Sequence, residues 1–280
     1  MLAIGCADSE DEYDDIESRT AEIVDNLLAA GFSDDDIEIR ESEIIEDLEL
    51  VEGEPQVFVD GDTHVTLEAS RELAAGGEGD GFRLWRTPGT VNNNTTICLA
   101  KATSAAAGFA SYVLTANMQA GVDQAKDNYA ALTAAGSFGL TFKTGNASIS
   151  ATGSLSHAIP GCTSTIWIYQ VSGGAGGSAG FPSGGAPYNQ VKLNSGLTGL
   201  TLDAHEHVAT HEIGHAIGLR HSDWKTRSSC GQNTNEGQSG AVLIPGTVDQ
   251  TTNSLMASCF AANTNGEFKG QDAQALNTLY

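Results

Sequence analysis

Three histidines and a glutamate are spaced along residues 211–223 as a metal site requires. The stretch reads HEIGHAIGLRHSD and follows the pattern HExxHxxGxxHxD. On a helix, His211 and His215 are one turn apart and project from the same face, so both imidazoles can reach one ion. Gly218 can end that helix in the left-handed conformation and bring His221 round as a third ligand. Three neutral imidazoles leave one coordination position open, which is typical of a catalytic zinc ion.

Glu212 directly follows the first of these histidines, where it can reach a water molecule on the same metal ion. We therefore expect it to be the general base. A different pairing is geometrically possible, because His207 and His211 are also four residues apart and His205 lies nearby. That pairing has no glutamate between its histidines and no Gly-His continuation, so we favour the first set. The alternative for the whole motif is a helix whose polar histidines are hydrogen-bonded and bind no metal.

The acidic residues are concentrated at one end of the chain. Residues 1–80 hold 26 Asp and Glu against 3 Lys and Arg, whereas residues 81–280 hold 10 of each kind. This distribution predicts two parts with separate roles, an acidic segment over 1–80 and a neutral domain over 81–280. The glycine-rich stretch 75–81 has the composition of a flexible linker between them. A net charge of −23 with only 13 Lys and Arg argues against nucleic acid as a partner, because phosphate contacts need basic residues.

Composition and periodicity indicate a globular chain in which the N-terminal part is mostly helical. Hydrophobic residues make up 40% of the sequence, and no apolar run approaches the ~20 residues of a membrane-spanning helix. Apolar residues over 16–28 recur at helical spacing and stop at Ala29-Ala30-Gly31, and a looser helical pattern continues over 37–48. Residues 56–62 predict a short strand that runs into an Asp-Gly turn.

The neutral part has a different composition, rich in Gly, Ala, Ser and Thr. It predicts strands at 95–101 and 165–171 and an amphipathic helix at 116–132. The run from 173 to 187 contains seven glycines, so we expect a long surface loop there.

Four cysteines of the neutral part suffice for two disulfides in a secreted protein. Of the three possible pairings we favour Cys230–Cys259 with Cys98–Cys162, because it ties the loop after the metal motif to the segment after Met256. The alternative is free buried thiols. No two of these residues have a Cys-x-x-Cys spacing, which argues against a thiolate zinc site.

The fifth cysteine, Cys6, lies close to the start of the sequence. Five residues before it are too few for a secretory signal, which takes ~15–30. The residues Leu2-Ala-Ile-Gly-Cys6 nevertheless resemble the end of a bacterial lipoprotein signal, in which the cysteine is lipidated. The two interpretations are a lipid anchor at Cys6 and a chance cysteine.

The HEIGHAIGLRHSD stretch resembles the metzincin clan of zinc endopeptidases, and its HEIGH core resembles the dual-action HEIGH metallopeptidases, which are secreted bacterial enzymes. Members of the clan have a tight Met-turn beneath the zinc ligands, and Asn253-Ser-Leu-Met256-Ala-Ser fits it. The resemblance covers 85–280. It implies an α+β fold, with a twisted mixed sheet, a zinc-binding helix and a C-terminal helix that suits 272–280, preceded by a mostly helical acidic prosegment over 1–80.

Two departures from the clan limit what the resemblance implies. Astacin- and serralysin-like members have a tyrosine two residues after the methionine, where this sequence has Ser258. A mechanism that uses that tyrosine therefore does not carry over. Asp223 follows the matrixin- and adamalysin-like pattern, in which the equivalent aspartate is a structural anchor, so we do not expect it to bind the metal.

Metzincins are commonly made as zymogens in which a group of the prosegment blocks the open zinc position. Astacin-like members use the aspartate of Phe-x-Gly-Asp, and Phe58-Val-Asp-Gly-Asp62 differs from this by one extra residue. Asp62 is therefore the candidate latency switch. Cys6 and His64 are the competing candidates, and the alternative for 60–62 is an ordinary hairpin turn.

These observations together predict a secreted zinc endopeptidase made as a zymogen, with one catalytic Zn²⁺ per chain. Nothing in the sequence indicates structural Ca²⁺. Substrate is expected to bind as an extended strand along a sheet edge, for which the residues just before the zinc helix are candidates: Asn189, Gln190, Val191 and Lys192.

Beyond the metal, we expect peptide or protein substrates as partners, no nucleic acid, and a monomeric chain. The expected location is outside the cell or on its surface, including the outer membrane if Cys6 carries lipid. Two other classes of function remain open: a zinc esterase or amidase, and a surface-anchored binding module on an inert scaffold. The intact Glu212 argues against the inert scaffold.

Overall fold

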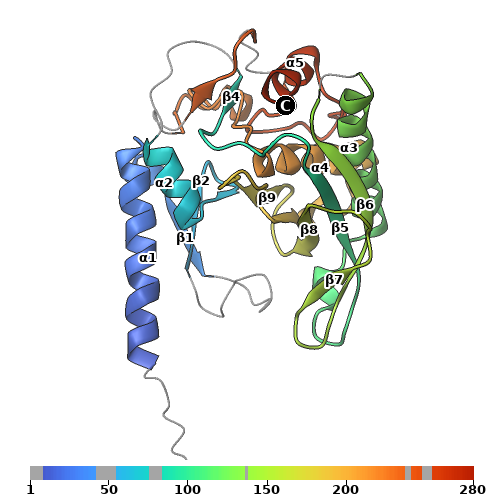
Figure 1. Ribbon diagram of the computed structural model, residues 1–280, viewed down its shortest axis with the longest axis horizontal. Coiled ribbons are helices and arrows are strands. Elements are labelled where there is room, and N and C mark those ends of the chain that lie inside the picture. The colour runs from blue at the N-terminus through green and yellow to red at the C-terminus, as the bar shows by residue number, and fades with distance from the viewer. Residues whose placement is uncertain (1–8, 42–54, 76–83, 136–137, 237–240, 248–253) are drawn as a thin grey trace, which may run out of the picture.

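The structure, a computed structural model, describes residues 9–41, 55–75, 84–135, 138–236, 241–247 and 254–280. Cys6 and the predicted linker after residue 75 lie outside these residues. No helix within them is long and apolar enough to cross a membrane. The chain has a mixed α+β architecture in which helices pack on a twisted sheet (Figure 1), so the expected fold class is confirmed at this level.

A nine-stranded mixed sheet is the framework of the described chain. Four neighbouring strands at its centre run parallel; the pairs on either side are antiparallel, except that β3 and β9 are parallel. In spatial order the strands are β1 (Glu38–Glu41), β2 (Pro55–Val59), β3 (Thr63–His64), β9 (Gly177–Gly180), β10 (Gln190–Asn194), β8 (Ser164–Val171), β5 (Thr96–Ala105), β6 (Thr141–Ile149) and β7 (Leu155–His157). A second, two-stranded sheet pairs β4 (Trp85–Arg86) with β11 (Val242–Leu243).

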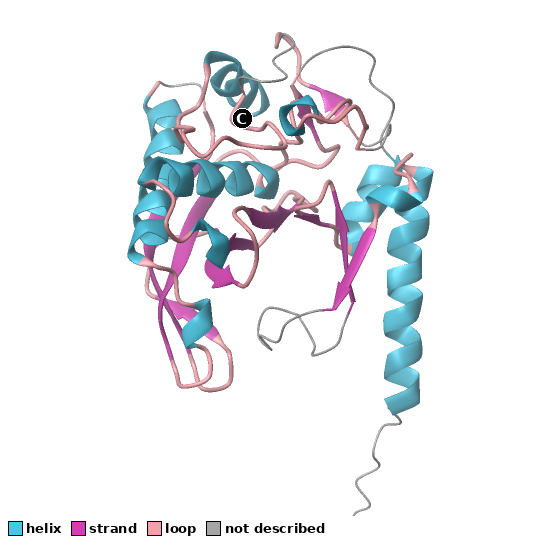
Figure 2. Cartoon of the chain, turned by 180° about the vertical axis from the view of Figure 1, so that it is seen from behind, coloured by secondary structure: helices cyan, strands magenta, loops and turns pink. Residues whose placement is uncertain are grey.

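Two helices, α3 (Ala116–Ala134) and α4 (Leu202–Ala216), cover one face of the central strands (Figure 2). Each begins at a threonine whose hydroxyl accepts a hydrogen bond from the first turn, Thr115 and Thr201 respectively. The helices approach closely at Gly121, where a Cβ atom would lie 2.7 Å from the backbone of α4. The main hydrophobic core fills the space between these helices and the sheet.

The N-terminal part builds its own core on the other end of the sheet. Helices α1 (Ser9–Ala29) and α2 (Leu67–Ala75) pack together against β2 (Figure 1). Gly31 follows α1 with a φ of +86°, so the helix ends where the sequence predicted. The buried residues of this second core come from 27–73, joined by one side chain from the rest of the chain: Leu27, Ala30, Phe32, Val57, Val59, Val65, Ala69, Leu73 and Phe181.

Two secondary-structure predictions were wrong. Residues 38–41 form β1 and pair with β2, whereas a helical pattern was expected over 37–48. A few isoleucines at loose spacing do not separate a helix from a strand. The glycine-rich run 173–187 was expected to be only a loop, but it contains β9. Glycine is a poor strand former, and its presence in a strand marks a close approach of other atoms.

The prediction that residues 189–192 provide a free sheet edge for substrate also has to be corrected. Residues 190–194 form β10, which is hydrogen-bonded to β8 on one side and to β9 on the other. Asn189, Gln190, Val191 and Lys192 therefore offer no free sheet edge. The edge that adjoins the zinc motif belongs to β9, and in this structure β3 occupies it, with Thr63 opposite Ala179 and His64 opposite Gly180.

The C-terminal helix α5 (Gly270–Leu279) includes the segment predicted to be helical at the end of the chain. Asp272 accepts hydrogen bonds from the backbone N–H of Lys269 at 3.0 Å and of Leu255 at 2.9 Å. It also accepts one from the hydroxyl of Ser254. One buried carboxylate thus caps α5 and fixes the turn that contains Met256.

Two disulfides, Cys98–Cys162 and Cys230–Cys259, are present in the structure, the pairing favoured from the sequence. The first joins β5 to the segment before β8. The second joins the loop that follows the histidine motif to the segment that follows Met256. It therefore ties together two loops that border the candidate site.

Candidate metal centre and active site

Helix α4 carries two of the three motif histidines on its last turns. His211 and His215 are 5% and 0% exposed. His211 donates from Nδ1 to the carbonyl oxygen of Leu255 at 2.9 Å, and His215 donates from Nδ1 to that of Leu219 at 2.8 Å. These backbone acceptors fix the orientation of both rings.

The chain turns sharply after α4 and returns to the same point. Gly218 has a φ of +113°, a conformation that side chains disfavour, and a Cβ atom there would lie 3.1 Å from the hydroxyl of Thr87. The backbone N–H of Arg220 then bonds to the carbonyl of Trp85 at 2.9 Å. This turn brings the fully buried His221 against the two helical histidines.

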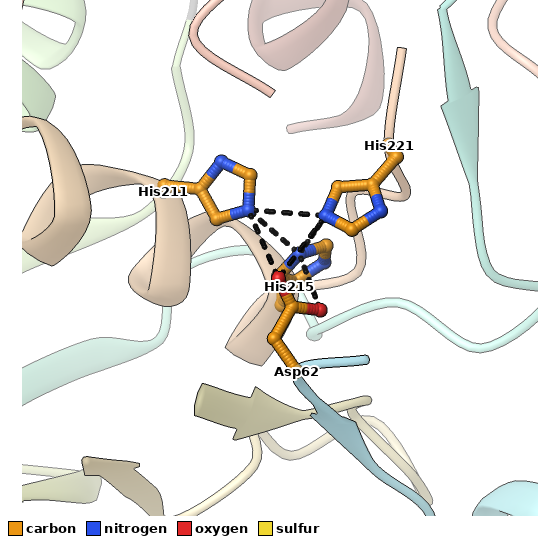
Figure 3. A group of neighbouring side chains, drawn as sticks. All are labelled: Asp62, His211, His215 and His221. Atoms are coloured by element: carbon orange, nitrogen blue, oxygen red, sulfur yellow. Dashed lines mark hydrogen bonds and ion pairs between the residues drawn. The ribbon is translucent and has the colours of Figure 1, made fainter. Parts of the chain in front are cut away.

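The three Nε2 atoms converge on a single point (Figure 3). They are 3.0 Å apart for His211 and His215, and 3.2 Å apart for each of these with His221. A triangle of this size leaves a point about 2.0 to 2.1 Å from all three corners, the usual distance between zinc and a histidine nitrogen.

The hydrogen-bond partners of the three rings show that this point suits a cation. Each Nδ1 faces a carbonyl or carboxylate oxygen, so each Nδ1 carries the hydrogen of a neutral imidazole. Three Nε2 lone pairs then face one another, and lone pairs cannot hydrogen-bond to each other. Burial, together with the neighbouring rings of His211 and His221, holds the pKa of His215 well below its ordinary value. The donor set therefore fits a metal ion.

Glu236 orients the third histidine and could not be recognised from the sequence. It is 1% exposed, and both carboxylate oxygens accept from Nδ1 of His221, at 2.9 and 3.0 Å. Burial alone would lower the pKa of His221, but Glu236 and Asp62 together raise it well above its ordinary value. The negative charges of Glu236 and Asp62 would also stabilise a cation bound between the three Nε2 atoms. Glu236 belongs to no motif, and only the fold brings it to the site.

Asp223 acts as a structural anchor, as the sequence predicted. Its carboxylate accepts from the backbone N–H and the hydroxyl of Ser229 at 2.8 and 2.6 Å. It also accepts from the N–H and hydroxyl of Ser258 at 2.9 and 2.8 Å. The Ser258 hydroxyl lies within 2.9 Å of Glu236 as well. The Ser258 hydroxyl therefore lies between these two carboxylates.

Met256 lies beneath the zinc motif, 1% exposed. Its carbonyl accepts from the backbone N–H of Ser222 at 2.7 Å. A Cβ atom on Gly214 would lie 2.6 Å from the Met256 sulfur, which explains why glycine is required in this part of HEIGH. The preceding carbonyl, of Leu255, is the acceptor that orients His211. This turn therefore supports two of the three histidines through backbone and packing contacts.

Glu212 lies at the wall of a cavity of about 490 Å³ that also borders His211 and Asp62. Its Oε2 atom has no hydrogen-bond partner among the described residues. Burial raises its pKa well above the ordinary value, and the negative charge of Asp62 adds to the shift. A Cβ atom on Gly177 of β9 would lie 2.9 Å from the Glu212 carboxylate, so a glycine there leaves room for it.

Asp62 closes the open side of the histidine cluster (Figure 3). Its carboxylate oxygens lie 3.3 Å from Nε2 of His221, 3.8 Å from that of His211 and 3.9 Å from that of His215. All four ligand atoms lie within 4.8 Å of one another. Burial alone would raise the pKa of Asp62, but its contacts with the rings of His221, His211 and His215 hold it well below its ordinary value.

The remaining histidines near the motif have other partners. Nδ1 of His64 lies 2.7 Å from the hydroxyl of Tyr188, and burial lowers the pKa of His64 to about 3. His205 bonds to the carbonyl of Thr201 at 2.8 Å. His207 lies 3.2 Å from the carbonyl of Asn265. The four-residue cluster contains none of these three histidines.

Comparison with known proteins places this geometry in a family. Residues 57–280 match the family described as dual-action HEIGH metallo-peptidase. The chain belongs to this family. The match begins at residue 57, so it includes Asp62 as well as the histidine motif. This HEIGH chain is accordingly a metallopeptidase, and the family implies a bound metal ion.

Solved structures of myroilysin are similar to this HEIGH metallopeptidase. One has a TM-score of 0.39 and 13% identity, and covers 68% of this chain and 95% of that chain. Another has a TM-score of 0.35 and 12% identity, and covers 68% and 85% respectively. Among curated proteins, none matches the chain.

Proposed function

We propose that this HEIGH metallopeptidase is a secreted, zinc-dependent endopeptidase that is made latent by its acidic N-terminal segment. The observation that carries the proposal is the meeting of Asp62 with His211, His215 and His221 at one point. The histidines supply a catalytic type of ligand set with one open position, and the aspartate fills that position from another part of the chain.

Peptide hydrolysis at this site depends on Glu212. A zinc ion held by the three histidines would polarise the scissile carbonyl and acidify a water molecule at the site. The Glu212 carboxylate, in the cavity wall next to His211, is placed to take a proton from that water and to pass it to the leaving amine. Burial, which raises its pKa, favours the protonated form that it must hold before it passes the proton on.

The substrate path in this proposal is the edge of β9. In the full chain β3 pairs with that edge through residues 63 and 64, and Asp62 directly precedes them. Departure of the hairpin formed by β2 and β3 would free both the edge and the open metal position. A substrate peptide would then add to β9 as an extended strand.

Secretion is supported by the two disulfides, since such bonds persist in oxidising compartments. A lipid anchor at Cys6 would keep the enzyme at the cell surface, and mass spectrometry of the purified protein tests for it.

The proposal predicts activity that depends on both metal and cleavage. Full-length chain loaded with zinc should be nearly inactive, and cutting it between residues 76 and 87 should release activity on a peptide library. A zinc chelator should abolish that activity. Turnover of esters but not peptides would instead select a zinc esterase or amidase. Absence of any turnover after cutting would favour a binding module on an inert scaffold.

Metal content provides a second test. The full chain should bind one zinc ion, and His221→Ala should greatly reduce the zinc retained after dialysis, because only two imidazoles and the Asp62 carboxylate remain. Glu236→Gln should weaken zinc binding about 10- to 100-fold, the usual effect of losing the partner of a ligand histidine. Both are measured by metal analysis and competition with a chelator.

The matched control for the metal test is His207→Ala. His207 lies on the same helix as His211, one turn earlier, but its partner is the carbonyl of Asn265. This variant should keep full zinc. Full retention in His221→Ala would refute the three-histidine site.

A further inference from the structure

The tip of the hairpin between β2 and β3 is anchored by two arginines that lie close to the metal centre. Asp60, with a φ of +62°, is 4% exposed and directs its carboxylate at Arg220, whose Nη2 lies 3.2 and 3.4 Å from the two oxygens. Arg227 donates from Nη1 to the backbone carbonyl of Asp60 at 2.9 Å. The hairpin therefore presents an acidic side chain to Arg220, two residues before Asp62 reaches the histidines.

Among the described residues, Asp60 is the only one whose carboxylate pairs with Arg220. The Arg220 side chain is fully buried, and its Nη2 also donates to the carbonyl of Glu236 at 2.8 Å. Within the described parts of the chain, its Nε and Nη1 atoms have no hydrogen-bond partner. Aromatic rings surround the guanidinium at 5.1 to 6.0 Å: Phe32, Trp224 and Phe181. A buried guanidinium of this kind is costly unless a negative charge accompanies it.

Release of the N-terminal segment would remove Asp60 and Phe32 together. Arg227 would keep its ion pair with Glu236 and its bond to Gln232. The carboxylate of Glu236 is already shared by His221, Arg227 and Ser258, so it cannot replace Asp60. Arg220 would then face the vacated space with unused donors, directly beside the third histidine.

We propose that Arg220 and the space filled by Asp60 form an anionic subsite that selects an Asp or Glu side chain about two residues from the bond that is cut. The proposal rests on the peptidase function proposed above, which it deepens by naming the substrate class. The hairpin lies beside the histidines in the way we expect of a bound peptide. Its β3 strand pairs with β9, Asp62 lies against the histidines, and Asp60 contacts Arg220. A substrate that pairs with the same edge can bring an acidic side chain to the same arginine.

The test compares matched peptides on the full chain nicked between residues 76 and 87. Pairs of peptides differ only by Asp against Asn, or Glu against Gln, at each position within three residues of the cut. The ratio of kcat/KM within a pair is the readout, because residual N-terminal fragment affects both members equally. We expect the acidic member to be preferred about 10- to 100-fold at one position, as for hydrogen bonds to a charged group.

Three variants assign the preference to Arg220. Arg220→Gln should reduce the ratio to below about 2-fold, whereas Arg220→Lys should retain part of it, because the charge remains but the planar guanidinium is lost. Lys225→Gln is the matched control: this nearby cation packs on Trp85 and Trp224, and among the described residues it has no hydrogen bond or ion pair with the hairpin. It should leave the ratio unchanged.

A binding measurement separates this inference from the peptidase proposal. Dissociation constants of the same peptide pairs are measured by calorimetry on the nicked, metal-free chain, where no turnover occurs. A preference for the acidic member that Arg220→Gln removes supports the subsite, even if no peptide is cleaved and the peptidase proposal fails. Equal binding and equal cleavage of both members, or a preference that survives Arg220→Gln, overturns the subsite and leaves the peptidase proposal standing.

Discussion

Glu212→Gln is expected to lower kcat for peptide cleavage about 10²- to 10⁴-fold, the usual contribution of a general base. The side chain keeps its size, so the cavity wall and the close approach to Gly177 are preserved. The amide cannot take a proton from water, however, and turnover is lost for that reason alone. The nicked enzyme and its variant are compared on one peptide substrate.

Metal analysis must accompany this measurement. Zinc content should stay at one ion per chain in Glu212→Gln, because the three histidines are intact. The matched control is Glu206→Gln, on the same helix, where the native carboxylate accepts from Asn128 at 2.9 Å. That variant should retain turnover within a few-fold. If Glu212→Gln kept wild-type turnover with zinc bound, Glu212 would not be the base.

Asp62→Ala is expected to raise the activity of the full-length chain about 10- to 100-fold before any cleavage occurs. The carboxylate lies 3.3 to 3.9 Å from the three Nε2 atoms, and its removal opens the position that it fills. A charge-assisted contact of this kind contributes roughly 1.5 to 3 kcal/mol, which corresponds to that range. Initial rates on a peptide, with the chain kept intact, give the measurement, and self-cleavage should also be faster.

His64→Ala distinguishes the blocking carboxylate from general loosening of the hairpin. His64 lies two residues from Asp62, but its ring contacts Tyr188 and Phe58 rather than the metal centre. Its effect on latency should be much smaller than that of Asp62→Ala. Two results count against the assignment: equal activation by the two variants, and a full-length wild type that is as active as the nicked chain.

The metal-binding helix could be predicted because its information is local. HEIGH places two histidines and a glutamate on successive turns, and Gly218 supplies the bend that returns His221. The groups that orient those rings come from distant loops. No spacing in the sequence identifies Glu236, the carbonyl of Leu255 or Gly177 of β9 as parts of the site, since their positions depend on how whole loops pack.

The edge of the sheet was misplaced for a related reason. Residues 190–194 read QVKLN, in which apolar and polar residues alternate, and this pattern does not distinguish an inner strand from an edge. The strand that β3 covers, β9, reads GSAG, a sequence without strand propensity. Its glycines are explained only by neighbours: Glu212 next to Gly177, and the ring of Tyr188 with the carbonyl of His64 next to Gly180.

The pairing of β3 with β9 also bears on how the protein avoids aggregation. An unpaired edge strand offers free N–H and C=O groups to any extended chain, including another copy of itself. While the hairpin is in place, residues 63 and 64 pair with the backbone groups of β9, so the intact chain does not expose them to other chains. If the hairpin leaves, as proposed above, substrates and other copies would compete for the same groups. The edge is only four residues long, which limits self-association in the active enzyme.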